Sequence, residues 1–228
     1  MIEFLQIFVD RLPQWWPEMQ TAAGRTLLLT AYAFMLAIAF GLALALAKLS
    51  RSTLLRRIAS IYIELMRGIP TLVVLFIIYF GIVPLGITLN AMTAGSIGLG
   101  LHAAAYVAEI FRSGIEAIHR GQREAALSVG MTPRQTLRHI VLPQATAIML
   151  PPLINMLVIV LKDTSICSLI SAPEIMLRAK DLASTYFRPM HLYVLAGAMY
   201  FAMAWPLSLV ARLWGKTARS RAPGDLIA

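Results

Sequence analysis

The chain of 228 residues is too apolar to be a water-soluble protein of its size. Hydrophobic residues make up 59% of the sequence and charged residues 14%, and the mean hydropathy is +0.74, whereas soluble domains carry about 25% charged residues. The single cysteine, Cys167, excludes an internal disulfide. Composition therefore excludes a soluble enzyme, a disordered chain and a disulfide-stabilised secreted domain. It predicts an integral membrane protein with a net charge of +9.

Five apolar segments are each long enough to cross a bilayer as a helix, which takes about 20 residues. The first, 27–47, contains no charged residue. We expect the second at 69–89, with the amphipathic stretch 58–66 extending the same helix on its inner side. The remaining three are predicted at 91–111, 145–171 and 190–213. The expected fold class is therefore all-α and integral to the membrane, with five transmembrane helices.

The distribution of cations predicts the orientation, because cytoplasmic loops hold an excess of Lys and Arg. With the N-terminus outside, the inner segments hold thirteen of the 20 cations and the outer segments hold five. We therefore expect an outer N-terminus and a cytoplasmic C-terminus, and this arrangement explains the basic charge without nucleic-acid binding. The inner segments are 48–57, 112–143 and 212–228.

Three regions follow from these spans. Residues 1–20 are predicted to be an amphipathic lead outside the membrane, with Trp15 and Trp16 near the outer interface, where such rings settle. Residues 21–214 form the expected transmembrane domain, and 215–228 form a cytoplasmic tail.

The inner loop at 112–143 carries more helix signals than a plain connection needs. Residues 122–129 predict a short helix, after which Gly130 suits a left-handed cap. The pair Thr132-Pro133 then predicts the start of a second helix, which we expect to end at Pro143.

The predicted loop helix offers a partner a small, charged surface. Ala125 and Ala126 are expected to be exposed beside Glu124. Small side chains let another backbone approach closely, and Glu124 supplies a charge for pairing. These signals leave open the alternative of a solvated loop without a partner.

Over these residues the sequence resembles ABC importer permeases. The EAA signature of that family is matched at every defined position. The match consists of Glu124-Ala125-Ala126, Gly130 after three further residues, Ile140 after nine more, and Leu142-Pro143 after one more. Three other segments are similar to the polar amino acid subfamily, the histidine, glutamine and glutamate/aspartate type. They are 67–72, 105–112 and 161–165.

The resemblance implies a type I importer (MetI-like) fold and a set of partners. These are a second permease subunit, identical or related, two ATP-binding subunits, and a periplasmic or surface-anchored solute-binding protein. It also implies that the chain lies in the bacterial inner membrane and moves an amino acid by alternating access. ATP and Mg²⁺ would belong to the ATPase, so no cofactor is expected in this chain. The residues implied in docking to the ATPase are Glu124, Ala125, Ala126 and Gly130.

Six ionisable residues lie within or beside the spans, where a charge at the bilayer centre costs about 2.5–3.5 kcal/mol. Glu64 and Arg67, three residues apart, can pair as a structural or gating pair at the inner mouth. Glu109 is expected to anchor the inner loop through Arg112. For His102 a packing role and a pathway role both remain open. The other two are Lys162 and Asp163.

The fourth span carries the groups that a zwitterionic amino acid would need. Lys162, Thr164 and Ser165 can donate to its carboxylate, and Asp163 can accept from its ammonium. Asn155 lies seven residues before Lys162 and shares its helix face. Two prolines interrupt the span, and broken helices frame transport sites. The alternative is that Lys162 and Asp163 pair only with each other near the outer interface.

The sequence contains no catalytic constellation. Its four His and one Cys lack the spacing of metal ligands, and Gly215-Lys216-Thr217 lacks the first glycine of a phosphate-binding loop. We therefore expect a non-enzymatic chain that receives its energy from a partner. Three alternatives remain: an importer permease for another small polar solute, an ATP-independent secondary transporter or channel, and a membrane scaffold or sensor that transports nothing.

Overall fold

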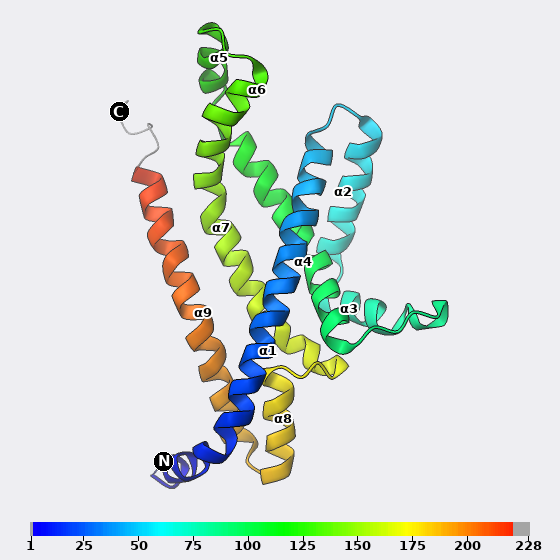
Figure 1. Ribbon diagram of the computed structural model, residues 1–228, viewed down its shortest axis with the longest axis vertical. Coiled ribbons are helices and arrows are strands. Elements are labelled where there is room, and N and C mark those ends of the chain that lie inside the picture. The colour runs from blue at the N-terminus through cyan, green and yellow to red at the C-terminus, as the bar shows by residue number, and fades with distance from the viewer. Residues whose placement is uncertain (1, 221–228) are drawn as a thin grey trace.

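The computed structural model describes residues 2–220, and within that range every regular element is a helix (Figure 1). This confirms the predicted all-α fold. Among the described residues, four helices are long and apolar enough to cross a bilayer, and a bent helix pair supplies a fifth span if it counts as one. Residues 221–228 of the predicted tail lie outside this range.

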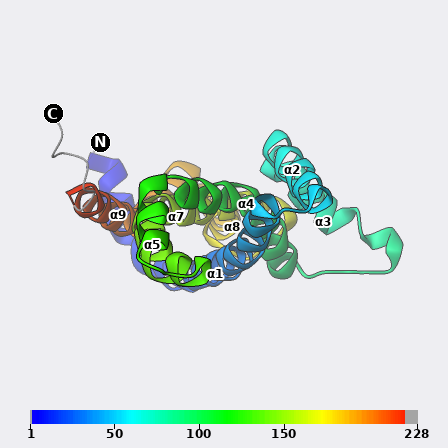
Figure 2. The same ribbon diagram turned by 90° about the horizontal axis from the view of Figure 1, so that it is seen from above.

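The longest helix, α1 (Ile2–Leu49), contains the predicted first span and runs beside α4 (Ala91–Glu116) (Figures 1 and 2). Small residues let the two backbones approach each other, as in many membrane helix pairs. A Cβ on Gly100 would lie 2.8 Å from the carbonyl oxygen of Ala33, and a Cβ on Gly41 would lie 2.7 Å from Cγ1 of Val107. The α1–α4 pair forms the centre of the core.

The predicted second span is not one straight helix. The structure has α2 (Thr53–Gly68) and α3 (Thr71–Phe80), which meet at an angle of 105°. The physical reason is Pro70, which lacks an N–H donor and disfavours a helical conformation in the residue before it. Ile69 accordingly has φ −100° and ψ 135°.

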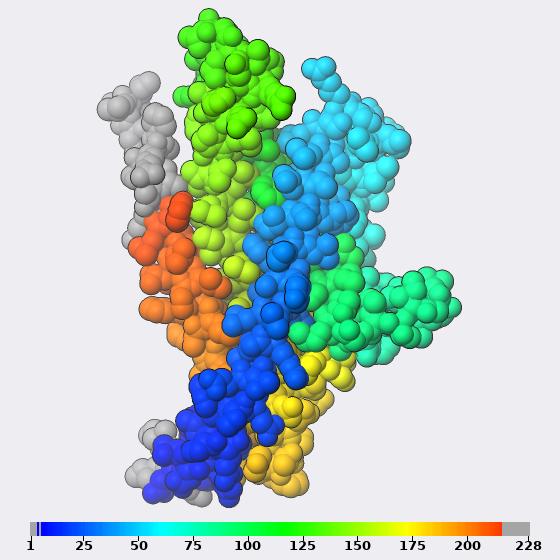
Figure 3. Space-filling model, in the orientation of Figure 1, coloured from blue at the N-terminus to red at the C-terminus, as the bar shows by residue number. Residues whose placement is uncertain are grey.

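After α3 the chain projects to one side of the bundle before it returns to α4 (Figures 2 and 3). The projection contains η1 (Val83–Leu85) and is followed by Gly86 in the left-handed region at φ 79°. Asn90 caps α4 by accepting a hydrogen bond from the Thr93 N–H at 2.9 Å.

At one end of the molecule, α5 (Arg120–Ser128) and α6 (Pro133–Thr136) stand above the bundle (Figures 1 and 3). The predicted helix end at Pro143 is wrong, because a π-helical turn, η2 (Leu137–Val141), leads directly into α7 (Leu142–Asp163). Pro143 lies in the first turn of α7, where a helix tolerates a missing N–H donor. The η2 turn therefore joins α6 and α7 into one continuous rod.

At the opposite end, η3 (Thr164–Ile170) leads to α8 (Ile175–Tyr186), and α8 and the start of α9 (Pro189–Ser220) pack around the first part of α1. Trp15 is fully buried there against Ile175, Leu182 and Leu192. α8 therefore shields this ring from lipid, and the placement of Trp15 and Trp16 near the outer interface stays a prediction. Trp16, on another face of α1, is 43% exposed.

Candidate functional site

Residues 119–136, which comprise α5, α6 and the turn between them and are here called the elbow, are held by local hydrogen bonds. The Met131 N–H donates to the Ala126 carbonyl at 3.1 Å, and the Gly130 N–H donates to the Leu127 carbonyl at 3.0 Å. This pattern is a Schellman cap, which requires a left-handed residue. Gly130 has φ 84°, which confirms the predicted left-handed cap.

The start of α6 is fixed by a reciprocal pair of bonds. The Gln135 N–H donates to Oγ1 of Thr132 at 3.3 Å, and the Thr132 N–H donates to Oε1 of Gln135 at 2.8 Å. The predicted N-cap at Thr132 is therefore confirmed, as one half of a capping box. Because both ends of the turn are capped, the elbow can move as one rigid piece.

The outward surface of the elbow combines a carboxylate with apolar side chains. Glu124 and Ala125 are exposed, and Val129 is 78% exposed. Ala126 was expected to be exposed but is buried, because it lies on the face of α5 that turns toward the rest of the elbow. Glu124, Ala125 and Val129 are therefore accessible to a partner protein.

A cavity of about 740 Å³ lies beneath the elbow, between α5, α6 and the end of α4. Apolar side chains such as Ile115, Leu127 and Leu137 line it, together with Arg120 and Arg123. Arg123 bridges the cavity wall by donating from Nη2 to the carbonyl of Ile115 at 3.1 Å. This bond ties α5 to the end of α4.

The end of α4 is fixed by an ion-pair cluster around Glu109. Arg112 Nη2 lies 2.8 Å from Oε2 of Glu109, as predicted, and Arg112 also pairs with Glu116. Lys48 Nζ lies 2.7 Å from Oε1 of Glu109. The contact with Lys48 connects α1 to this cluster and was not predicted from the sequence.

The predicted pair of Glu64 and Arg67 is not formed among the described residues. The Arg67 guanidinium lies instead over the Tyr106 ring, 5.6 Å from its centroid, where a cation–π contact competes for it. Both members of the predicted pair are exposed in the single chain.

His102 crosses the break between α2 and α3. Its Nε2 lies 3.3 Å from the Ile69 carbonyl oxygen, and its Nδ1 lies 3.3 Å from Oγ1 of Thr71. The ring is 8% exposed. These contacts favour the packing role over the pathway role, because both ring nitrogens already face partners at the break.

The five predicted pathway residues do not form one cluster. Asn155 and Lys162 are exposed on the same face of α7, as predicted, and Ser165 is half-buried. Thr164 is fully buried and donates to the Leu161 carbonyl at 2.7 Å. Asp163 is half-buried, and within the described chain it makes no ion pair with Lys162.

A buried carboxyl group that sequence reasoning missed lies at the end opposite the elbow. Glu174 is fully buried and accepts hydrogen bonds from the Met176 N–H at 2.9 Å, the Leu177 N–H at 2.8 Å and the Tyr200 hydroxyl. Burial raises the pKa of Glu174, although these hydrogen bonds oppose the rise. Glu174 caps α8, but glutamate is not among the preferred N-cap residues, so the sequence offered no signal for this role.

Comparison with known proteins decides the family. A family described as "Binding-protein-dependent transport system inner membrane component" matches residues 37–221. The "Probable amino-acid ABC transporter permease protein YckA" of Bacillus subtilis (strain 168) is 41% identical over 203 residues, which cover 89% of this chain and 90% of YckA. The chain belongs to the family of binding-protein-dependent transport system inner membrane components.

Another sequence relative and two solved structures also match this inner membrane component. The "Probable glutamine ABC transporter permease protein GlnM" of the same Bacillus strain is 33% identical, over 81% of this chain and 85% of GlnM. A solved "amino acid ABC transporter with histidines" matches with a TM-score of 0.86 and 36% identity, covering 92% of this chain and 98% of that one. The MetNI methionine transporter, at 18% identity and a TM-score of 0.73, matches in fold.

These matches confirm the resemblance drawn from the EAA signature and the MetI-like fold of the inner membrane component. The family consists of transport components that act with a binding protein, so the chain is a permease and not an enzyme. Among the described residues, no group of three or more His, Cys, Asp or Glu side chains is placed to hold a metal ion.

Proposed function

We propose that this permease imports polar amino acids as one half of a paired pathway, driven by two separate ATP-binding subunits. The names of YckA, GlnM and the solved amino acid transporter support the substrate class. The second half is another permease, identical or related, and a periplasmic or surface-anchored binding protein delivers the substrate. ATP and Mg²⁺ bind to the ATPase, and this chain needs no cofactor.

The observation that carries this proposal is the rigid elbow at the end of a continuous rod. The Schellman cap at Gly130 and the capping box at Thr132 hold the elbow together, and η2 joins it to α7. A partner that pushes on Glu124 and Ala125 would therefore move α7 as a lever. Rigid movement of packed helices is a usual form of alternating access.

The moving lever carries the proposed substrate groups. Asn155 and Lys162 lie on the exposed face of α7, where Lys162 can bind a substrate carboxylate. Ser165 and Asp163 lie near the same end of the helix, and Asp163 can accept from the ammonium. Thr164, which points inward, acts by fixing the end of α7 and not by touching substrate.

The remaining site residues take supporting roles in this proposal. Glu109 and Arg112 anchor the elbow to the membrane helices through the cluster that includes Lys48. Glu64 and Arg67 lie exposed beside the break in α2–α3 and act as a gate between the two permeases. The elbow lies in the cytoplasm and the N-terminus lies outside, as the cation distribution favours.

Reconstitution tests the function. The permease would be purified with its ATPase and placed in liposomes with ATP inside, binding protein outside and a labelled polar amino acid as the probe. We expect uptake that requires both ATP and the binding protein. Uptake without ATP would instead identify a secondary transporter. If no amino acid is taken up but another small polar solute is, the proposed substrate class is wrong.

Cross-linking tests the elbow separately. Cysteine would replace Ala125 at the elbow, and as a matched control it would replace the 85% exposed Phe187 at the opposite end. The native Cys167 is fully buried, so a maleimide reagent should react with the introduced thiol. We expect A125C to cross-link to the ATPase and F187C not to do so. The reverse result would overturn both the docking role and the orientation.

A further inference from the structure

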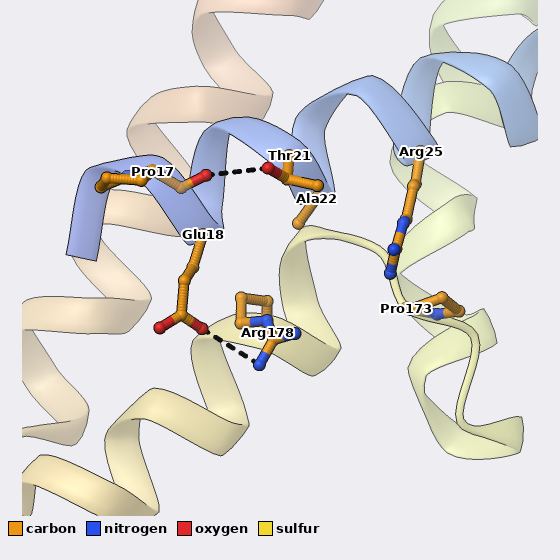
Figure 4. Close-up of a pocket in the computed structure, with 7 residues that line it drawn as sticks. All are labelled: Pro17, Glu18, Thr21, Ala22, Arg25, Pro173 and Arg178. Atoms are coloured by element: carbon orange, nitrogen blue, oxygen red, sulfur yellow. Dashed lines mark hydrogen bonds and ion pairs between the residues drawn. The ribbon is translucent and has the colours of Figure 1, made fainter. Parts of the chain in front are cut away.

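Two pockets lie in line along α1, and only the first has charged residues in its walls. The first, of about 260 Å³, lies between α1 and the start of α8 and is here called the polar pocket. Its walls combine the charged and hydroxyl groups of Glu18, Thr21, Arg25 and Arg178 with the apolar side chains of Pro17, Ala22 and Pro173 (Figure 4). The second, of about 420 Å³, is a groove between α1 and α4. Its walls include Leu28, Tyr32, Leu36, Met92 and Ile97.

The two pockets share one face of α1. Positions 18, 21, 25, 28, 32 and 36 follow one another at intervals of three or four residues, so their side chains form a single stripe. Arg25 and Leu28 are separated by about 4.5 Å along the helix axis. The polar pocket therefore ends within one helical turn of the place where the apolar groove begins.

This change of polarity coincides with the predicted boundary of the hydrocarbon layer. Arg25 is the last charged residue before the uncharged stretch 27–47, so its side chain lies at the level of the lipid headgroups. Leu28 is 53% exposed and Tyr32 is 59% exposed, and both face the layer of acyl chains. The Ser96 hydroxyl in the groove donates to the Met92 carbonyl at 2.9 Å, so it is already satisfied.

Of the two cations in the polar pocket, only Arg178 has an ion-pair partner within the described residues. Arg178 Nη1 lies 3.1 Å from Oε2 of Glu18 and 4.0 Å from Oδ2 of Asp181, so both nearby carboxylates pair with Arg178. Arg25 has no carboxylate within ion-pair distance in the described part of the chain. Figure 4 shows its side chain extending from α1 toward Pro173, apart from the Glu18–Arg178 pair. The pocket therefore suits a group with a single negative charge, such as a phosphodiester.

We propose that α1 and α4 bind one phospholipid in the leaflet opposite the elbow. The phosphodiester lies on the Arg25 guanidinium, and one acyl chain lies in the groove along Leu28, Tyr32 and Leu36. A phospholipid matches both cavities at once, because its charge and its apolar chain are joined in the order that the stripe presents. The proposal needs only a membrane-spanning α1, so it does not depend on the substrate or on coupling to an ATPase.

Photolabelling of the intact transporter in nanodiscs tests the site. The probe is phosphatidylglycerol with a diazirine in one acyl chain, and mass spectrometry of digested protein locates the label. We expect labelling on α1 or α4 within the groove. R25Q should lower it by about tenfold, the size expected for loss of one charge-assisted hydrogen bond. R11Q, which changes an exposed arginine of the same helix outside the pocket, should leave labelling unchanged.

A second pair of variants tests the groove itself. S96W places an indole in the groove and should abolish labelling there. M35W adds the same ring at a 67% exposed position of α1 that does not line the groove. The lipid probe should label the groove of this variant as strongly as that of the wild type. Co-purification of the ATPase with each variant checks that the complex has assembled.

A comparison that needs no variant uses the wild-type transporter and two further probes. Diacylglycerol with the same diazirine lacks the phosphate and should label the groove at least tenfold less. Millimolar inorganic phosphate and free amino acids should not displace the lipid probe. The proposal would be overturned if both lipids labelled the groove equally or if R25Q were labelled as strongly as the wild type. It would also be overturned if phosphate or an amino acid displaced the probe, or if the label appeared on a second permease at this face.

Discussion

Lys48 at the end of α1 and Glu109 in α4 form an ion pair, with 2.7 Å between Nζ and Oε1, although 61 residues separate them in the sequence. Glu109 also pairs with Arg112, which begins the segment leading to the elbow. One carboxylate therefore joins the first membrane helix to the base of the elbow. All three side chains are 21–31% exposed, so solvent screens these pairs only in part.

The substitution Glu109→Gln should weaken this junction. We expect a loss of roughly 1–2 kcal/mol in the free energy of unfolding, because two charge-assisted contacts disappear from a partly buried site. Thermal unfolding of the purified permease measures the loss. Glu116→Gln is the matched control, because Glu116 is 50% exposed and contacts only Arg112 of this cluster. Equal effects of both substitutions would contradict the role of Glu109 as the shared partner.

Gly130→Val should uncouple the elbow. Valine in the left-handed region costs about 1–2 kcal/mol, so the Schellman cap should open and the elbow should lose its rigidity. We expect the ATPase activity of the assembled transporter to respond several-fold less to substrate-loaded binding protein. Gly197→Val is the control, because a Cβ there meets no atom within 4 Å and the backbone is helical. Full coupling in G130V would contradict the lever mechanism.

The features that sequence reasoning predicted correctly are local. The left-handed Gly130 and the cap at Thr132 depend on residues within one or two turns, so the pattern of residue types determines them. The third span was predicted at 91–111, and α4 covers Ala91–Glu116. A long apolar run with small residues has no competing structure in a membrane.

The features that sequence reasoning missed depend on contacts between distant segments. The angle of 105° at Pro70 is held in part by His102, which lies more than 30 residues later and contacts both sides of the break. Ala126 is buried because α5 folds back on the rest of the elbow, which the helix signals alone do not show. Glu174 is buried because α9 brings Tyr200 to it across 26 residues.

Lys162→Ala should impair substrate handling without loss of assembly. Lys162 is exposed on the face of α7 that also carries Asn155, so removal of its ammonium takes away a ligand for the substrate carboxylate. We expect a rise of about tenfold in the amino acid concentration that gives half-maximal uptake, the cost of one charged hydrogen bond. Lys180→Ala changes an exposed lysine of α8 and should have no effect.

Thr164→Val distinguishes a supporting residue from a substrate-binding one. The buried Thr164 hydroxyl donates to Leu161 inside the protein, so its loss should lower thermal stability by about 1 kcal/mol. The amino acid concentration that gives half-maximal uptake should stay close to that of the wild type. A shift as large as that of K162A would mean that Thr164 touches the substrate and that the end of α7 rearranges.

Glu174 should make the stability of the permease depend on pH. Burial raises the pKa of Glu174 above the ordinary value for glutamate, which is about 4.3 in an unfolded chain. A raised carboxyl pKa favours the folded state while the group is protonated. Its contribution is therefore complete below pH 4.3 and is lost as the pH rises through the raised pKa. Thermal unfolding at a series of pH values should show this loss in the wild type.

Glu174→Gln should remove this part of the pH dependence, because the amide stays neutral at every pH; its oxygen can accept from the Tyr200 hydroxyl and the Met176 N–H as Oε2 does, whereas the Leu177 N–H loses its acceptor. Its stability should therefore fall less than that of the wild type as the pH rises. Asp181→Asn, at a carboxylate that is 51% exposed, is the matched control and should keep the wild-type profile. A wild-type profile in E174Q would show that another group titrates, since the folded state would then gain nothing from a protonated carboxyl at the start of α8.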